Sequence, residues 1–171
     1  MQDTWLRRIV KAMKLDADFY ARVASDTSLS REALWLVIIP SWLVTSLLLC
    51  TGLNLGGLGG IIISLVGSTT IPASFFAQAG LIYCIGRRFF GSTATYTKVQ
   101  RALGYAFTTR YGQILFGFIP CYGIVGLVWM MAADSVVTKY ALGVEKGSVL
   151  TIVILSYVVF MQDRYYLLYY L

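Results

Sequence analysis

The chain has 171 residues, of which 58% are hydrophobic and only 13% are charged. Soluble domains carry roughly 25% charged residues, so this composition excludes an ordinary soluble protein and indicates a membrane protein. The net charge of +6 resides in short basic stretches between long apolar runs. This pattern argues against nucleic acid as a partner, and favours topology signals and contacts with anionic lipid.

The sequence also lacks the usual residues of catalysis and metal binding. It contains no histidine, which is the commonest general base and a common metal or pigment ligand. The three cysteines form no CxxC pair, and no serine, cysteine or lysine has a base at motif spacing. We therefore predict no enzyme, no metal site and no cofactor, and only lipids or apolar pigments remain as small ligands.

Residues 1–32 are predicted to be a cytoplasmic amphipathic segment. Its first part has apolar residues at helical spacing and basic residues on the other side, as in a helix that lies on a membrane surface. The apolar side consists of Trp5, Leu6, Ile9, Val10 and Met13, and the basic side of Arg7, Arg8, Lys11 and Lys14. A second amphipathic stretch follows, with the apolar residues Phe19, Tyr20, Val23 and Ala24.

Two long apolar runs come next and are predicted to cross the membrane. The first, from Ala33 to about Leu53, is uncharged for 21 residues, close to the roughly 20 that span hydrocarbon. The second, from about Leu58 to Ile85, is longer and is expected to tilt, or to bend at Pro72. Small residues recur along it and favour close helix packing. This small-residue stripe consists of Gly60, Ser64, Ser68, Ala73 and Ala77.

Three further spans follow a basic connection that contains Arg87, Arg88, Lys98 and Arg101. Arg87 and Arg88, like the basic residues of the first amphipathic helix, are predicted to lie at the membrane surface. They run from about Ala102 to Ile119, from Tyr122 to about Leu142, and from Gly147 to about Tyr166. The predicted fold is therefore all-α, a bundle of five transmembrane helices in residues 33–166. The aromatic tail, residues 167–171, is expected at the outer interface.

The distribution of lysine and arginine predicts the orientation. Twelve of these residues fall on the side of the amino-terminal segment, and only Arg164 falls on the opposite side. The positive-inside rule then places the amino end in the cytoplasm and the carboxyl end outside an inner membrane. Cys50 and Cys121 are both expected near the outer face, which leaves a disulfide between them open, whereas Cys84 is expected on the cytoplasmic side.

Arg110 is the most unusual residue of the predicted spans. It lies nine residues after Arg101, about 13 Å into the membrane for a continuous helix. A charge at that depth costs at least about 2.5 to 3.5 kcal/mol. Asp134 is the predicted counter-charge, and Gln113 is a candidate third member. Two interpretations stay open: a site for an ion, a lipid headgroup or a partner helix, and a structural pair or a snorkelling arginine.

Several short motifs resemble the Yip1 domain family, and its bacterial branch in particular. They are RRFFG at 87–91, RALGYA at 101–106, IP at 119–120, VW at 128–129 and KYALGV at 139–144. The resemblance implies a five-helix bundle with a cytoplasmic amino end and a short outer tail. Eukaryotic members are linked to vesicle traffic and Rab proteins through a longer cytoplasmic segment with an Asp-Leu-Tyr-Gly-Pro motif. That motif is absent from this sequence, so we expect no Rab-type GTPase as a partner.

Two functional hypotheses remain. The preferred one is a non-catalytic accessory or scaffold subunit that packs into a larger bacterial membrane complex, such as a photosynthetic or respiratory one. Its expected partners are other integral membrane subunits and the lipid bilayer. The alternative is a small transporter, or a lipid-handling or membrane-organising protein, that uses the Arg110 region as a polar site inside the membrane. The lack of an internal inverted repeat argues against a transporter.

Overall fold

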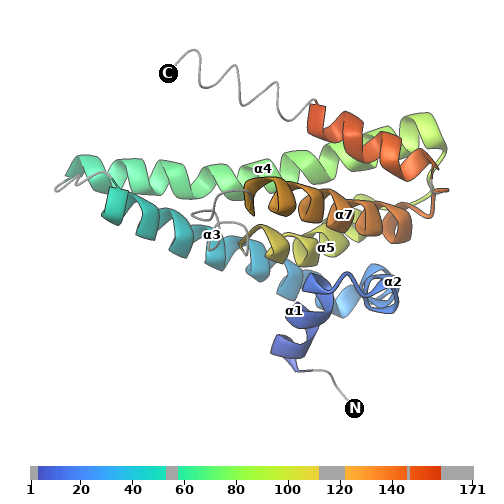
Figure 1. Ribbon diagram of the computed structural model, residues 1–171, viewed down its shortest axis with the longest axis horizontal. Coiled ribbons are helices and arrows are strands. Elements are labelled where there is room, and N and C mark those ends of the chain that lie inside the picture. Colours follow the sequence, from blue (N-terminus) through green and yellow to red (C-terminus); the bar gives the residue numbers. More distant parts are fainter. Residues whose placement is uncertain (1–3, 53–57, 112–121, 146, 159–171) are drawn as a thin grey trace.

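The fold is all-α throughout the part of the chain that the structure describes. A computed structural model describes residues 4–52, 58–111, 122–145 and 147–158, and within these ranges it contains helices and turns but no strand. The helices α3, α4, α5 and α7 pack side by side, and two short helices, α1 and α2, lie against one side of them (Figure 1). This agrees with the predicted helical bundle.

The helices lie close to the predicted apolar runs. Their bounds are Trp5–Met13 for α1, Ala17–Ser25 for α2, Ser30–Gly52 for α3, Leu58–Phe90 for α4, Tyr96–Ala106 for α5 and Tyr122–Leu142 for α7. A 3₁₀ turn, Thr27–Leu29, precedes α3, and an apolar helix, Gly147–Val158, follows α7. Among the described residues, Ile124–Leu142 is the segment long and apolar enough to cross a membrane by length and composition. α3 and α4 each continue through an internal proline, Pro40 and Pro72.

Helix α5 forms the centre of the packing. It contacts α2, α3, α4 and α7, and all residues from 101 to 106 are buried. Gly104 makes the closest approach, because a Cβ atom at this position would lie 2.7 Å from the carbonyl oxygen of Ala33 on α3. A side chain here would separate the two helices, so glycine is required for their contact.

The third predicted span is not one continuous helix. α5 ends at Ala106, Phe107 forms a turn, and helix resumes at residues 108–111. Thr108 and Thr109 each donate a side-chain hydrogen bond of 2.7 Å to a carbonyl three residues earlier, at Tyr105 and Ala106. Such bonds compete with the regular helical pattern and often bend helices. The turn falls just before the polar residues Thr108, Thr109 and Arg110, which interrupt the apolar run of the predicted span.

The connections after α4 and α7 meet at one end of the bundle. Gly91 and Gly143 follow these helices with φ of 64° and 68°, the left-handed conformation that ends helices. The hydroxyl of Ser92 donates a 2.7 Å hydrogen bond to the carbonyl of Leu142. These two connections, predicted to lie on the same side of the membrane, are thus in direct contact.

Replacing Gly104 with leucine tests the contact between α3 and α5. We expect the variant to lose about 1 to 3 kcal/mol of unfolding free energy, because the new side chain overpacks against Ala33. Thermal unfolding in detergent measures the loss. Gly80→Ala is the control, since a Cβ there meets nothing within 4 Å. Equal melting temperatures for Gly104→Leu and Gly80→Ala would contradict the proposed close approach.

Candidate functional site

Four polar side chains from four separate segments meet inside the bundle. Gln78 comes from α4, Arg110 from the segment after α5, Asp134 from α7 and Tyr157 from the helix Gly147–Val158. We call this set the central polar cluster. Gln78 and Asp134 are buried, and the Arg110 side chain is 15% exposed. Charged groups placed in this way inside a membrane protein are costly and therefore need partners.

One oxygen of Asp134 organises the central polar cluster. Asp134 Oδ2 accepts hydrogen bonds of 2.8 Å from Gln78 Nε2 and 2.8 Å from the Tyr157 hydroxyl. Arg110 Nη2 lies 3.4 Å from the same oxygen and also donates to Oε1 of Gln78. The guanidinium stands 4.4 Å from the ring centroid of Phe107, which adds a cation–π contact. Gln78, Asp134 and Arg110 thus bond to one another in a closed triangle, and Tyr157 joins it through Asp134.

The structure brings together two of the three residues that the sequence predicted for this site. Arg110 and Asp134 form an ion pair, whereas Gln113 lies outside the described residues. Sequence reasoning missed Gln78 and Tyr157. Gln78 carried a signal, because an amide within a long apolar run needs a buried partner. Tyr157 carried none, since tyrosine is common at both ends of membrane helices.

A second arginine is buried where the sequence predicted an exposed topology charge. Arg101 is only 5% exposed, and it donates hydrogen bonds of 2.7 Å each to the carbonyls of Val23 and Ala24. A third bond of 2.9 Å reaches the hydroxyl of Ser30. These carbonyls belong to the last turn of α2, where a helix leaves acceptors unpaired and favours cations. Arg101 therefore joins α2 to α5, and its assignment to the basic loop was wrong.

A third polar contact joins α1 to the bundle. Arg8 pairs with Glu32 near the start of α3, and the Tyr105 hydroxyl donates a 2.7 Å hydrogen bond to the same carboxylate. Arg8 was predicted to be a membrane-surface residue, but it is half-buried in this pair. Of the other predicted surface cations, Arg7, Lys14, Arg87 and Arg88 are exposed and Lys11 is half-buried.

Tyr20 on α2 completes the packing of the amino-terminal segment. Its ring is fully buried, and its hydroxyl donates a 3.1 Å hydrogen bond to the carbonyl of Ala12 on α1. Burial raises the pKa of this phenol, so it remains a neutral donor at physiological pH. α1 and α2 are therefore linked to each other as well as to the bundle.

Comparison with known proteins accounts for nearly the whole chain. The Yip1 domain matches residues 13–162. The chain belongs to the Yip1 domain family. Members of this family are multi-pass membrane proteins, so the chain is a membrane protein. No match was found among curated proteins or among solved structures.

The Yip1 domain match covers some of these polar contacts and leaves others outside. It includes every member of the central polar cluster and all of α2, with its partner Arg101. It begins at the last residue of α1, Met13. The central polar cluster is therefore within the Yip1 domain, whereas most of α1 precedes it.

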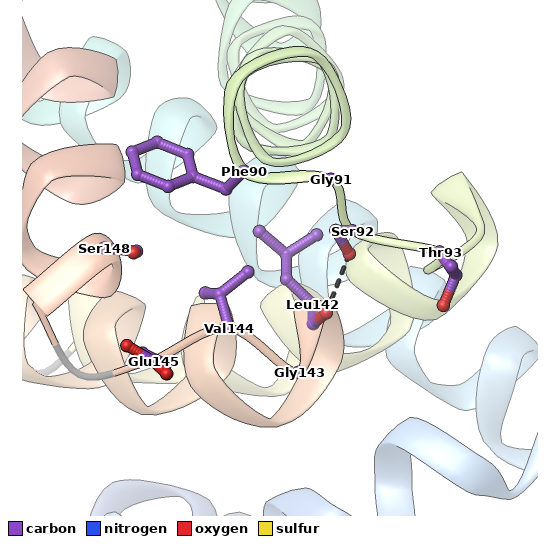
Figure 2. A pocket seen from close by; sticks show the side chains of 9 residues that line it. All are labelled: Phe90, Gly91, Ser92, Thr93, Leu142, Gly143, Val144, Glu145 and Ser148. Atoms are coloured by element: carbon purple, nitrogen blue, oxygen red, sulfur yellow. Dashed lines mark hydrogen bonds between the residues drawn. The ribbon is translucent and has the colours of Figure 1, made fainter.

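A cavity of about 380 Å³ lies at the end of the helical bundle where the connections after α4 and α7 meet (Figure 2). Figure 2 shows Phe90 to Thr93 on one side and Leu142 to Glu145 with Ser148 on the other. Ser92 is already engaged by Leu142, and Glu145 is the one ionisable residue among those that line it. This lining offers no pair of groups for acid–base or nucleophilic chemistry.

The small-residue stripe is described only in part. Ala73 and Ala77 are exposed on α4, whereas the side chains of Gly60, Ser64 and Ser68 lie outside the described residues. The side chain of Cys50 and the whole of Cys121 also lie outside them, as does the disulfide that the sequence leaves open between the two, and Cys84 is a free, exposed thiol. No group of three or more metal-ligating side chains occurs in the described part of the chain.

A double-mutant cycle tests the central ion pair. Arg110→Met and Asp134→Leu should each lower the unfolding free energy by about 3 to 5 kcal/mol, because each leaves one buried charge without its partner. The double variant should lose clearly less than the sum of the two, as measured by unfolding in detergent. Arg88→Met, at an exposed position, is the control. Strictly additive losses would show that the two charges do not interact.

Replacing Arg101 with methionine tests its role at the end of α2. The variant leaves the carbonyls of Val23 and Ala24 without their donor, at about 1 to 3 kcal/mol for each buried group. We therefore expect α2 to detach and trypsin to cleave after Arg22 faster than in the original protein. Lys98→Met removes a cation from the same helix as a control. Equal cleavage rates in both variants would refute the capping role.

Proposed function

We propose that this Yip1 domain protein is a non-catalytic accessory or scaffold subunit of a larger complex in a bacterial inner membrane, such as a photosynthetic or respiratory one. One contrast carries the proposal: the groups of the central polar cluster bond to one another, while broad apolar faces point outward. Its partners are other membrane subunits and lipid, with no Rab-type GTPase and no nucleic acid. Bound small molecules, where present, are lipids or apolar pigments.

The interior supports a structural role. Asp134 accepts three donors at one oxygen, and Arg110 and Gln78 bond to each other as well as to that carboxylate. A general base or nucleophile has to be free to meet a substrate. In this arrangement the same groups connect α4, the segment after α5, α7 and the last helix.

The outward faces support a packing role. Large apolar side chains are exposed along α3, along the first half of α7 and along the last helix. They are Trp35, Ile39, Trp42 and Leu43, then Ile124, Val125, Val128 and Trp129, and finally Leu150, Ile154, Leu155 and Val158. Exposed apolar area of this extent requires lipid or the apolar face of another chain.

The proposed topology has five spans, with the amino end in the cytoplasm and the carboxyl end outside. The contact between Ser92 and Leu142 supports one shared side for the two basic connections, and the packing of α2 on α5 and α7 is consistent with a cytoplasmic amino-terminal segment. The positive-inside rule indicates that this shared side is the cytoplasmic one.

The exposed alanines of α4 are the proposed contact with a partner. Ala73 and Ala77 lie four residues apart and are exposed, although α4 packs its other faces on α3 and α5. Small side chains at this spacing let two membrane helices approach closely. In the proposed complex this face of α4 meets a helix of another subunit.

A second candidate function rests on the residual exposure of Arg110. Its side chain is 15% exposed, whereas that of Asp134 is 3% exposed. A partly accessible cation of this kind supports a small transporter, or a lipid-handling or membrane-organising protein, that binds an anionic group at Arg110. The two candidates differ in whether Arg110 or the α4 face determines activity.

Co-purification from the native membrane tests the scaffold role. We expect the tagged protein to retain other membrane subunits in fixed stoichiometry in mild detergent. Ala73→Leu with Ala77→Leu should reduce that retention at least about tenfold, since it obstructs close helix packing without touching the protein's own core. Ala17→Leu with Ala21→Leu, at two exposed positions of α2 with the same spacing, adds the same bulk away from these apolar faces and serves as the control.

Two outcomes would refute the scaffold role. One is recovery of the protein alone or only as a homo-oligomer. The other is an equal loss of partners from the α4 variant and the α2 control. A growth or transport defect in a correctly folded Arg110→Met variant, with no bound subunit in either form, would instead support the second candidate.

A further inference from the structure

We infer that α1 is a binding site for anionic lipid. One side of this helix is attached to the bundle, and an adjacent side enters the surface of the bilayer. This inference is independent of the proposed scaffold role. Nearly all of α1 precedes the Yip1 domain match, so it is a property of this chain rather than of the matched domain.

One side of α1 is anchored to the rest of the protein. Ala12 is fully buried, and its carbonyl accepts the hydrogen bond of Tyr20. One turn earlier, Arg8 pairs with Glu32, which also holds the hydroxyl of Tyr105. Because these contacts come from α2, α3 and α5, α1 has a defined rotation about its own axis.

The turn after α1 is equally constrained. Leu15 has a φ of 56°, the left-handed conformation normally left to glycine at the end of a helix. The amides of Leu15 and Asp16 donate to the carbonyls of Ala12 and Lys11, each at 3.1 Å. A leucine in this conformation persists only when its surroundings demand it, and Leu15 packs against the core. The orientation of α1 is therefore part of the fold.

The next side of α1 is apolar and exposed. Trp5, Leu6, Val10 and Met13 are 52%, 67%, 48% and 37% exposed. Leu6, Val10 and Met13 share one side of the helix, and Trp5 borders the anchored side at the free end of α1, one turn before Ile9, which packs against the core. Figure 1 shows α1 projecting from the bundle, across the direction of α3 and α4. This is the orientation expected of a helix that lies in the plane of a membrane while the bundle crosses it.

A basic edge follows the apolar stripe around the helix. Arg7 and Lys14 are exposed and Lys11 is half-buried. An apolar stripe bordered by cations complements a bilayer surface with anionic headgroups, in which tryptophan settles at the level of the headgroups. α3, joined to α1 through Glu32, exposes Trp35 and Ile39. The exposed apolar surface of α3 thus begins one turn after Glu32, the residue that holds α1.

Fluorescence of Trp5 tests this inference on the purified protein. Trp35, Trp42 and Trp129 are replaced by phenylalanine, and the protein is reconstituted in vesicles of brominated phosphatidylcholine with or without brominated phosphatidylglycerol. We expect brominated lipid to quench Trp5 and aqueous acrylamide to quench it little. The quenching should be stronger with the anionic lipid and should weaken at high salt.

Charge-neutral variants separate lipid selectivity from simple burial. Arg7→Gln, Lys11→Gln and Lys14→Gln together should abolish the preference for phosphatidylglycerol, with about a fivefold weaker insertion for each cation removed. The matched control removes three cations elsewhere, through Arg87→Gln, Arg88→Gln and Lys98→Gln, and should keep the preference.

Three results would overturn the inference. Quenching of Trp5 by acrylamide but not by lipid would place α1 in water. Trp5 shielded from both quenchers would mean that protein, such as a second copy of the chain, covers the stripe. An equal effect of the two triple variants would show that α1 has no particular role in the choice of lipid. Each result holds whether or not a larger complex exists.

Discussion

The ion pair between Arg110 and Asp134 is the constraint around which the bundle is arranged. A single charge in the middle of a membrane costs at least about 2.5 to 3.5 kcal/mol, so each of these two residues needs the other. Their pairing requires the segment after α5 to face α7, and the bonds from Gln78 and Tyr157 draw α4 and the last helix to the same point. Apolar contact alone would leave the rotation of these helices less defined, because lipid competes for apolar surfaces.

Arg101, at the other end of the segment that contains Arg110, is also a buried charge that needs partners. Arg101 satisfies two carbonyls of α2 and is buried by them, so a helix end and a charge compensate each other. Gly104, one turn further on, allows α3 to close over α5. Together, Arg101 and Gly104 allow α5 to be buried at the centre of the helix packing, although its first turns are polar. The turn at Phe107 then redirects the chain so that Arg110 reaches Asp134.

The helices and the ion pair could be predicted because their signals are local. Long apolar runs, and a lone charge of each sign within them, are visible in the sequence of one segment at a time. The burial of Arg101 and the roles of Gln78 and Tyr157 could not be predicted, because they depend on how helices rotate against one another. The turn at Phe107 had a readable signal in Thr108 and Thr109, whose hydroxyls bond the preceding turn.

α1 and α2 show that the same amphipathic pattern can have two different outcomes. Both are nine-residue helices with apolar residues on one side. The stripe of α2 is buried because Arg101 draws the end of that helix onto α5, so that Phe19 and Tyr20 enter the core. Most of the stripe of α1 stays exposed, with Ile9 packed against the core, because its anchors occupy an adjacent side of the helix. The position of the anchoring polar contact, rather than the hydrophobicity of the helix, therefore decides which helix is buried in the core and which stays exposed to the membrane.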